Sequence, residues 1–263
     1  MTPYDEQTLS FDIADQPRRG VLRTPKELAE RAGLLINLAA DCEQSLDGEC
    51  FRIVPEIFLA AGHRVATFDL PNHGPRVNEY GAGLDGWAAA ARAGTDVFAD
   101  IRETGTALID VCLQQGSITE GAIVVSGTSR GGIAALHLMA AVPRIVAAAV
   151  QWPVTHLPAL REFSGTADNA IVQRANAEAL IPALAGRHVF VAIGSVDPRI
   201  DAVSCHRFFE QLDASSGTVK PELFTGPGAT HAKSCDPSIP RFSMATAYDA
   251  SAAFLLSCIP RVS

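Results

Sequence analysis

The chain has 263 residues, a length at which an open α/β sheet usually remains one domain. Hydrophobic residues make up 48% and aromatic residues only 6%, so we expect a core of Ala, Val, Leu and Ile, which suits buried parallel strands covered by helices. The formal net charge is −8 and the sequence has no Lys/Arg run, so it predicts no surface for nucleic acid or for anionic lipid.

The segment from Met1 to Glu6 lacks the basic and apolar regions of a secretory signal. No apolar run approaches the ~20 residues that cross a bilayer. We therefore expect a cytoplasmic protein without a membrane segment. The six cysteines stand at irregular spacings with no Cys-x-x-Cys, which predicts free thiols and no zinc site, although Cys42 and Cys50 are close enough in sequence to bridge if the chain were exported.

Two antiparallel strands are expected at residues 8–13 and 19–23. From Gly33 onward, short apolar runs alternate with longer amphipathic stretches, the pattern of βαβ units. Further strands are predicted at residues 34–38, 64–69, 122–126, 145–150, 188–193 and 219–224. Helices are predicted at residues 51–61, 96–115, 130–141, 170–184, 203–212 and 244–256. This order predicts one mostly parallel sheet of about eight strands with helices on both faces.

The Gly-Thr-Ser-Arg-Gly sequence at residues 127–131 fits the G-x-S-x-G nucleophile elbow. A predicted buried strand ends directly before it and a predicted helix begins directly after it, which is the context that the motif requires. A glycine-rich turn with an incidental serine is the alternative interpretation. Because a serine hydroxyl is a poor nucleophile at neutral pH, Ser129 needs an imidazole as its base.

At this point the chain resembles the α/β-hydrolase family, and within it the compact dienelactone-hydrolase and prolyl-oligopeptidase-like groups. The resemblance extends from about Gly33 to the end. A second match is the sequence Asp-Leu-Pro-Asn-His-Gly at residues 69–74, which looks like the family's Asp-x-x-x-His-Gly loop after a strand. The resemblance implies an α/β-hydrolase fold without a large cap domain, and a triad in the order nucleophile, acid, histidine.

The resemblance assigns the acid to Asp197, in an Asp-Pro-Arg-Ile sequence after a predicted strand, with Asp201 as the second candidate. It assigns the base to His231, in a glycine-rich loop after the last predicted strand. An aspartate would hold the imidazole in the tautomer that serine needs and would stabilise the imidazolium. A turn aspartate before proline and a solvent-exposed loop histidine are the alternative interpretations.

The oxyanion hole is expected to use two backbone N–H groups. One comes from Arg130, at the start of the helix after the nucleophile, where the helix dipole favours negative charge. The other should follow the strand at residues 34–38, with Ala40 preferred and Ala39 as the alternative. Here the sequence departs from the family's His-Gly pattern.

Residues 72–94 and 152–185 are expected to lie as loops or insertions over the active edge of the sheet. The first contains a G-x-G-x-x-G sequence at residues 81–86, but no strand directly precedes it, so we predict no dinucleotide cofactor. Its aromatic residues Tyr80 and Trp87, and Trp152 of the second segment, are candidates for substrate contact. Ordinary packing explains these aromatic residues equally well.

The favoured function is hydrolysis of a carboxylic ester of small or medium size through an acyl-enzyme, without a cofactor or metal. Cleavage of an amide or lactone is a less favoured form of this reaction. The same triad also serves carbon–carbon bond hydrolases and acyltransferases, and the fold also occurs in non-catalytic binding proteins. The sequence does not identify the acyl group, the leaving group or the oligomeric state.

Overall fold

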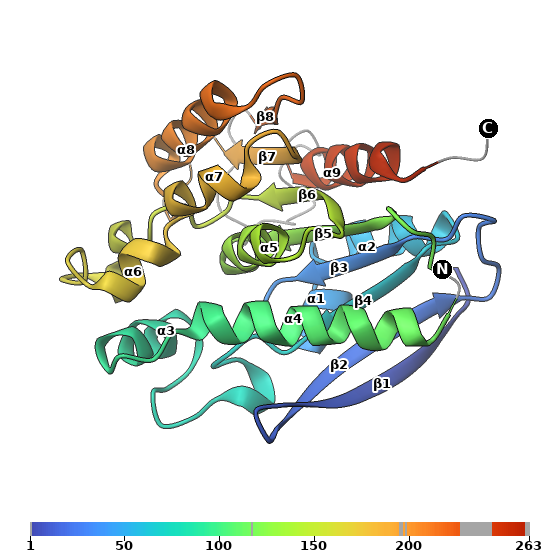
Figure 1. Cartoon of the computed structure of the whole chain (residues 1–263), viewed down its shortest axis with the longest axis horizontal. Coiled ribbons are helices and arrows are strands. Elements are labelled where there is room, and N and C mark those ends of the chain that lie inside the picture. The colour runs from blue at the N-terminus through green and yellow to red at the C-terminus, as the bar shows by residue number, and fades with distance from the viewer. Residues whose placement is uncertain (1, 117, 195–196, 198, 227–243, 261–263) are drawn as a thin grey trace.

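The computed structural model describes residues 2–116, 118–194, 197, 199–226 and 244–260 (Figure 1). The strands are β1 Tyr4–Ile13, β2 Gln16–Pro25, β3 Leu34–Leu38, β4 Arg64–Phe68, β5 Ile123–Thr128, β6 Ile145–Gln151, β7 His188–Gly194 and β8 Glu222–Gly226. The helices are α1 Cys42–Asp47, α2 Ile53–Ala60, α3 Gly83–Arg92, α4 Val97–Gln114, α5 Arg130–Ala141, α6 Ala170–Ala175, α7 Ile181–Leu184, α8 Ala202–Ser215 and α9 Met244–Cys258. Short 3₁₀ turns are η1 Gly74–Arg76, η2 Leu157–Ala159, η3 Arg161–Phe163 and η4 Ala177–Leu180.

The strands form one sheet in the order β1-β2-β4-β3-β5-β6-β7-β8. The pairs β1–β2 and β2–β4 are antiparallel, and all the other neighbouring strands in this sheet run parallel. Every residue of the central strands β3, β4 and β5 is buried, as expected for parallel strands that are covered on both faces. The predicted α/β-hydrolase fold with its mostly parallel sheet is therefore confirmed.

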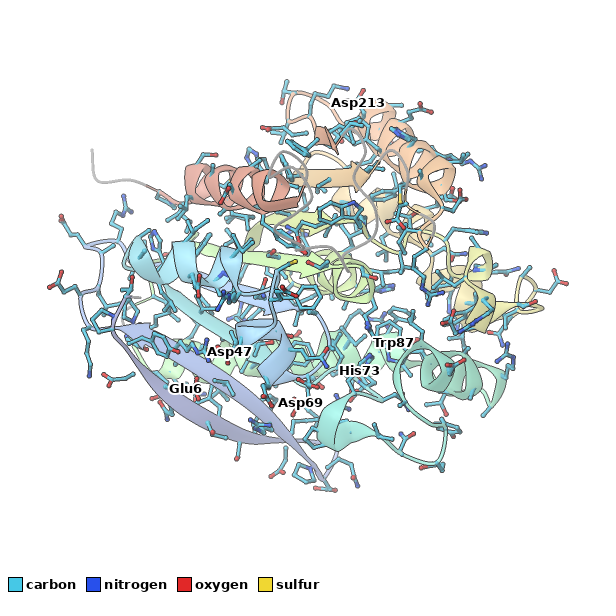
Figure 2. The ribbon with its side chains drawn as sticks, turned by 180° about the vertical axis from the view of Figure 1, so that it is seen from behind. Glu6, Asp47, Asp69, His73, Trp87 and Asp213 are labelled. Carbon is cyan, nitrogen blue, oxygen red and sulfur yellow. The ribbon has the colours of Figure 1, made fainter. Side chains whose placement is uncertain are left out.

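Helices cover both faces of the sheet (Figure 1). On one face, α3, α4, α5 and α8 pack in a core cluster with side chains from β3, β5 and β7. On the other face, α1, α2 and α9 pack in a second cluster (Figure 2). Arg23 of β2 connects this second layer to the antiparallel edge, because its guanidinium lies 2.8 Å from the Glu6 carboxylate and 2.7 Å from that of Asp47.

The segment at residues 72–94, expected to be irregular, contains the ten-residue helix α3. Its sequence is rich in alanine, the residue with the strongest helix propensity. Trp87 and three of the helix's alanines are buried, so packing adds to that propensity. The predicted helix at 170–184 is instead divided into α6, η4 and α7, because Asn176 adopts an extended backbone (φ −63°, ψ 143°) and its side chain accepts a hydrogen bond from Leu157 N–H.

Four described cysteines, namely Cys42, Cys112, Cys205 and Cys258, are free thiols. Burial raises the pKa of Cys112 and Cys205 to about 12, so these two are inert core residues. The expectation of free thiols is wrong for Cys50, which takes part in a disulfide with none of these four residues. Sequence spacing alone cannot identify which cysteines meet in space.

His137 of α5 is a buried histidine at the contact between helices. Its ring stacks on Phe98, with ring centroids 4.4 Å apart, and its Nε2–H donates to the Ala175 carbonyl at 2.9 Å. Its Nδ1 then accepts from the Arg102 guanidinium at 3.2 Å, an arrangement that only the neutral ring allows. Burial, followed by the charge of Arg102, lowers the pKa of His137 to about 4.

We expect the free energy of unfolding to fall as the pH is lowered from 6.5 towards 4. In this range His137 is protonated in the unfolded chain but stays neutral in the folded protein, so protonation favours unfolding. H137Q should reduce this slope by up to about 1.4 kcal/mol per pH unit, as measured by urea unfolding at several pH values. H188Q, which changes an exposed histidine, serves as the control and should keep the wild-type slope. An unchanged slope in H137Q would contradict the assignment.

Candidate active site

Ser129 lies at the turn between β5 and α5 and has an unusual backbone conformation. Its φ is 57° and its ψ is −116°, a region that residues with a side chain rarely adopt. Its N–H donates to the Gln151 carbonyl at 2.9 Å, and its own carbonyl accepts from Val154 N–H at 3.1 Å. These bonds to the neighbouring chain hold the strained residue in place, and such strain is concentrated at functional sites.

The glycines around Ser129 are required by close backbone contacts. A Cβ on Gly127 would lie 2.1 Å from the Gly131 carbonyl oxygen, and a Cβ on Gly131 would lie 1.9 Å from the Leu38 carbonyl oxygen. Neither position has room for a side chain. The G-x-S-x-G sequence therefore forms the predicted strand–turn–helix unit, which brings the start of α5 against the end of β3.

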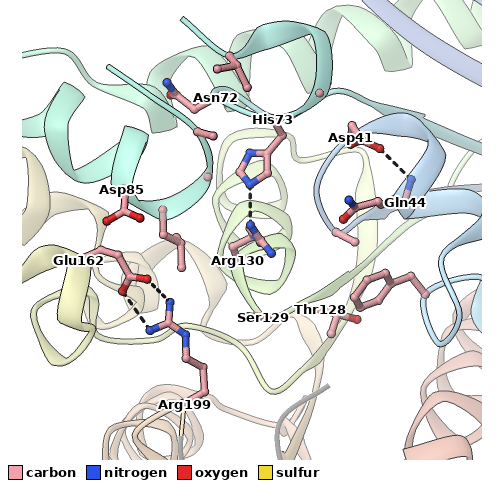
Figure 3. Close-up of a pocket in the computed structure, with 17 residues that line it drawn as sticks. Asp41, Gln44, Asn72, His73, Asp85, Thr128, Ser129, Arg130, Glu162 and Arg199 are labelled. Atoms are coloured by element: carbon pink, nitrogen blue, oxygen red, sulfur yellow. Dashed lines mark hydrogen bonds and ion pairs between the residues drawn. The ribbon is translucent and has the colours of Figure 1, made fainter. Parts of the chain in front are cut away.

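Ser129 lines a cavity of about 880 Å³ (Figure 3). The lining comes from the ends of β3 and β5, the loop after β4, the start of α3 and the segments after β6 and β7. Its charged residues are Asp41, Asp85, Arg130, Glu162 and Arg199. A cavity of this volume is typical of small-molecule sites.

Arg130 is the first residue of α5, where backbone N–H groups have no partner within the helix. Its N–H therefore stays the predicted first oxyanion donor. The predicted second donors differ in position: Ala39 lines the cavity, whereas Ala40 does not. The N–H groups of both point to the buried Ser45 hydroxyl oxygen, at 3.0 Å from Ala39 and 3.4 Å from Ala40. A substrate oxyanion would compete with this hydroxyl, a contact that the sequence did not indicate.

Asp197 follows β7, on the same edge of the sheet as Ser129. Its Oδ1 accepts from the N–H groups of Arg199 at 2.8 Å and Ile200 at 2.9 Å, which fixes the carboxylate. Asp201, the second candidate, instead caps α8 by accepting from Val203 N–H at 3.1 Å. Asp201 is exposed whereas Asp197 is half-buried, which makes Asp201 the weaker candidate for a triad acid.

His231, the predicted base, lies outside the described residues. The chain before it ends in β8, whose last residue Gly226 pairs with Gly194 at the end of β7. Because β5, β6, β7 and β8 run parallel, the chain leaves β8 at the edge where Ser129 and Asp197 lie. The three-residue triad stays a prediction.

His73 and Arg130 form a polar pair on the cavity wall (Figure 3). The Nδ1–H of His73 donates to the Pro71 carbonyl at 2.7 Å, so its Nε2 accepts from the Arg130 guanidinium at 2.8 Å. Burial, followed by the charge of Arg130, lowers the pKa of His73 to about 4. His73 is therefore neutral near pH 7. The Asp-x-x-x-His-Gly match at residues 69–74 predicted the loop that contains His73, but no role for its side chain.

Glu162 and Arg199 form an ion pair on another part of the wall (Figure 3). Two guanidinium nitrogens of Arg199 lie 3.0 and 2.6 Å from the carboxylate oxygens of Glu162. Burial raises the pKa of Glu162, but hydrogen bonds from Arg199 outweigh it and hold that pKa below its ordinary value. Glu162 and Arg199 come from segments 37 residues apart, so the sequence had no local signal for the pair.

Tyr80, Trp87 and Trp152, the candidates for substrate contact, are not among the described residues that line this cavity. Trp87 and Trp152 are 0% and 1% exposed. The Trp87 indole donates to the Pro71 carbonyl at 2.7 Å and its ring meets the edge of His73, so it supports the wall from behind (Figure 2). Tyr80 packs against the core, and its hydroxyl lies 3.2 Å from that of Thr95.

The G-x-G-x-x-G segment does not begin a helix directly after a strand, as a dinucleotide site requires. Ala82, Gly83 and Asp85 line the cavity instead, at the start of α3. Among the residues that the structure describes, no cluster of three His, Cys, Asp or Glu side chains could hold a metal. In the same part of the chain, no helix is both long and apolar enough to cross a membrane.

Comparison with solved structures finds similar folds in esterases. The chain matches a cold-adapted esterase from an Arctic intertidal metagenomic library at 16% identity, over 98% of this chain and 95% of that one, with a TM-score of 0.71. An esterase of Pyrococcus furiosus matches at 17% identity, over 98% and 94% of the two chains, with a TM-score of 0.70. Est1E of Butyrivibrio proteoclasticus matches at 17% identity, over 97% and 99%, with a TM-score of 0.66.

At these identities the structural likeness shows the fold. A search of curated protein sequences finds no match. Residues 44–255 match the sequence pattern of the alpha/beta hydrolase family, which is most of the chain and includes the nucleophile elbow. With its elbow, its sheet order and this match, the chain belongs to the α/β hydrolase family.

Proposed function

We propose that this protein hydrolyses a carboxylic ester of small or medium size through an acyl-enzyme on Ser129. The observation that carries the proposal is the strained Ser129 (φ 57°) at the N-terminus of α5, open to a cavity of about 880 Å³. A serine in this conformation places its hydroxyl at the tip of the turn, where a base and a substrate carbonyl can both reach it. The esterases with similar folds support the same reaction.

In the proposed first half-reaction, His231 takes the hydroxyl proton while the Ser129 oxygen attacks the ester carbonyl. The Arg130 backbone N–H stabilises the oxyanion, assisted by the partial positive charge at the start of α5. The alcohol leaves with the proton from His231. In the second half-reaction, His231 deprotonates a water that attacks the acyl-enzyme, which releases the acid and restores the serine.

Asp197 has the role of orienting His231. Its Oδ1 is held by two backbone N–H groups, so the carboxylate is fixed before any substrate arrives. Pre-organisation of this kind is what a triad acid needs, because a mobile carboxylate would not select one imidazole tautomer.

S129A should reduce ester turnover by roughly 10³-fold or more, because no other group supplies the nucleophile. Turnover of p-nitrophenyl butyrate and labelling by a fluorophosphonate measure this directly, and mass spectrometry locates the label. S257A alters an exposed serine on α9 and should leave both readouts at the wild-type level. Labelling of S129A at the wild-type rate would refute the assignment.

D197N should lower kcat by roughly 10²- to 10⁴-fold while the protein stays folded, because asparagine keeps the oxygen that accepts from Arg199 and Ile200. Steady-state kinetics together with circular dichroism test this.

D201N provides the matched control for D197N. It alters the helix cap of α8, so it should lower the melting temperature slightly and leave kcat near wild type. If D201N lost activity and D197N kept it, the order of the two candidates would be reversed.

A further inference from the structure

The Arg130 side chain is unusual among the arginines of this protein. Most of the other arginines that the structure describes lie within 4 Å of a carboxylate, for example Arg18, Arg23, Arg76 and Arg199. The half-buried Arg187 instead donates to three backbone carbonyls. In the described part of the chain, the one hydrogen-bond acceptor of the Arg130 guanidinium is the neutral Nε2 of His73.

The surroundings of Arg130 hold this guanidinium in the cavity without neutralising it. His73 is itself fixed, because its Nδ1–H is bonded to Pro71 and its ring packs against Trp87. A guanidinium has five N–H donors, and His73 accepts one of them. Within the described residues the remaining donors have no protein acceptor, so they are open to a ligand that enters the cavity.

The N-terminus of α3 lies next to the Arg130 guanidinium. Gly83, its first residue, has a φ of 61°, and a Cβ there would lie 3.5 Å from the Arg130 Nη1 and 3.9 Å from the His73 Nε2. The N-cap residue Ala82 has no side chain that could cap the helix. The partial positive charge of a ten-residue helix therefore adds to that of the guanidinium.

Among the described residues, no carboxylate of the cavity forms an ion pair with Arg130, although the charges of Glu162 and Asp41 act on it from a distance. Glu162 receives two hydrogen bonds from Arg199, and Asp41 caps α1 by accepting from Gln44 N–H at 2.8 Å. Asp85 is exposed, in the first turn of α3. No carboxylate of the described residues lies within ion-pair distance of Arg130, so its positive charge stays available next to Ser129.

From this geometry we infer that Arg130 binds a carboxylate of the substrate, so that the preferred esters carry a free carboxylate a short distance from the bond that is cleaved. A planar carboxylate matches the fork of a guanidinium. The inference rests on the proposed ester hydrolysis and adds the substrate class. Arg130 thus has two separate roles, its backbone N–H toward the oxyanion and its side chain toward the substrate anion.

Two matched pairs of esters test this. In the first pair, monoethyl glutarate carries a carboxylate on the acyl side and diethyl glutarate is its neutral counterpart. In the second pair, O-acetyl-3-hydroxypropanoate carries the carboxylate on the alcohol side and its methyl ester is neutral. Wild-type enzyme should have the higher kcat/KM for the charged member of at least one pair. In R130M the ratio of charged to neutral kcat/KM should fall by about 10- to 100-fold for that pair, as expected for the loss of a charge-assisted hydrogen bond. R130K should recover part of the ratio, because lysine keeps the charge but lacks the fork.

R144M is the control, because Arg144 is exposed, pairs with Asp110 and precedes β6 at the opposite edge of the sheet. It should leave the ratio and the basal turnover unchanged. Release of ethanol is measured for the first pair and release of acetate for the second, so both members of a pair are compared at the same kind of bond and effects on the oxyanion cancel in the ratio. If the neutral esters are hydrolysed but the ratio of charged to neutral kcat/KM is the same in wild type and R130M, the carboxylate site is refuted. The proposal of ester hydrolysis is then still supported.

A binding measurement makes the test independent of turnover. Glutarate titrated into S129A should release heat with a dissociation constant at least about tenfold lower than for S129A/R130M. The same constant for both proteins would overturn the inference, whether or not any ester is hydrolysed.

Discussion

The site depends on one backbone constraint, the tight turn that carries Ser129 between β5 and α5. The chain reverses so closely there that Gly131 touches the Leu38 carbonyl, which leaves no space for a Cβ. The turn forces Ser129 into a strained backbone conformation with a φ of 57°, which hydrogen bonds to Gln151 and Val154 stabilise. Because these partners belong to β6 and the segment after it, the turn is held by the sheet and not by its own residues alone.

The same turn determines the electrostatics of the cavity. It directs the N-terminus of α5 at the site and places the side chain of the next residue, Arg130, on the cavity wall. The loop after β4 then supplies His73, whose burial and contact with Arg130 keep its pKa near 4 and its ring neutral. A protonated His73 would repel the guanidinium, so the neutral ring is what allows the positive charge to remain next to Ser129.

Helix α3 shows how a segment far from the strands becomes part of the site. Its alanines and Trp87 pack inward, and the Trp87 indole is bonded to the Pro71 carbonyl, the same oxygen that fixes His73. Trp87 therefore affects the site through the position of the loop after β4, without touching the cavity. Trp87 and Trp152 are core residues, 0% and 1% exposed, whereas Tyr80 is only partly buried.

The sequence by itself determined the order of the strands, the mostly parallel sheet and the elbow around Ser129. These features depend on local patterns: apolar runs for buried strands, amphipathic periods for helices, and glycines where a turn admits no side chain. The resemblance added Asp197 and His231 as expectations; the first lies at the sheet edge that carries Ser129, and the second lies outside the described residues.

Only the tertiary structure decided the contacts of Ser45, His73, Arg130 and Glu162. Each of these side chains meets its partner through a non-local or turn geometry that leaves no periodic signal in the sequence. For the same reason the sequence could not predict that Asp201 caps a helix while Arg130 lacks a carboxylate partner among the described residues.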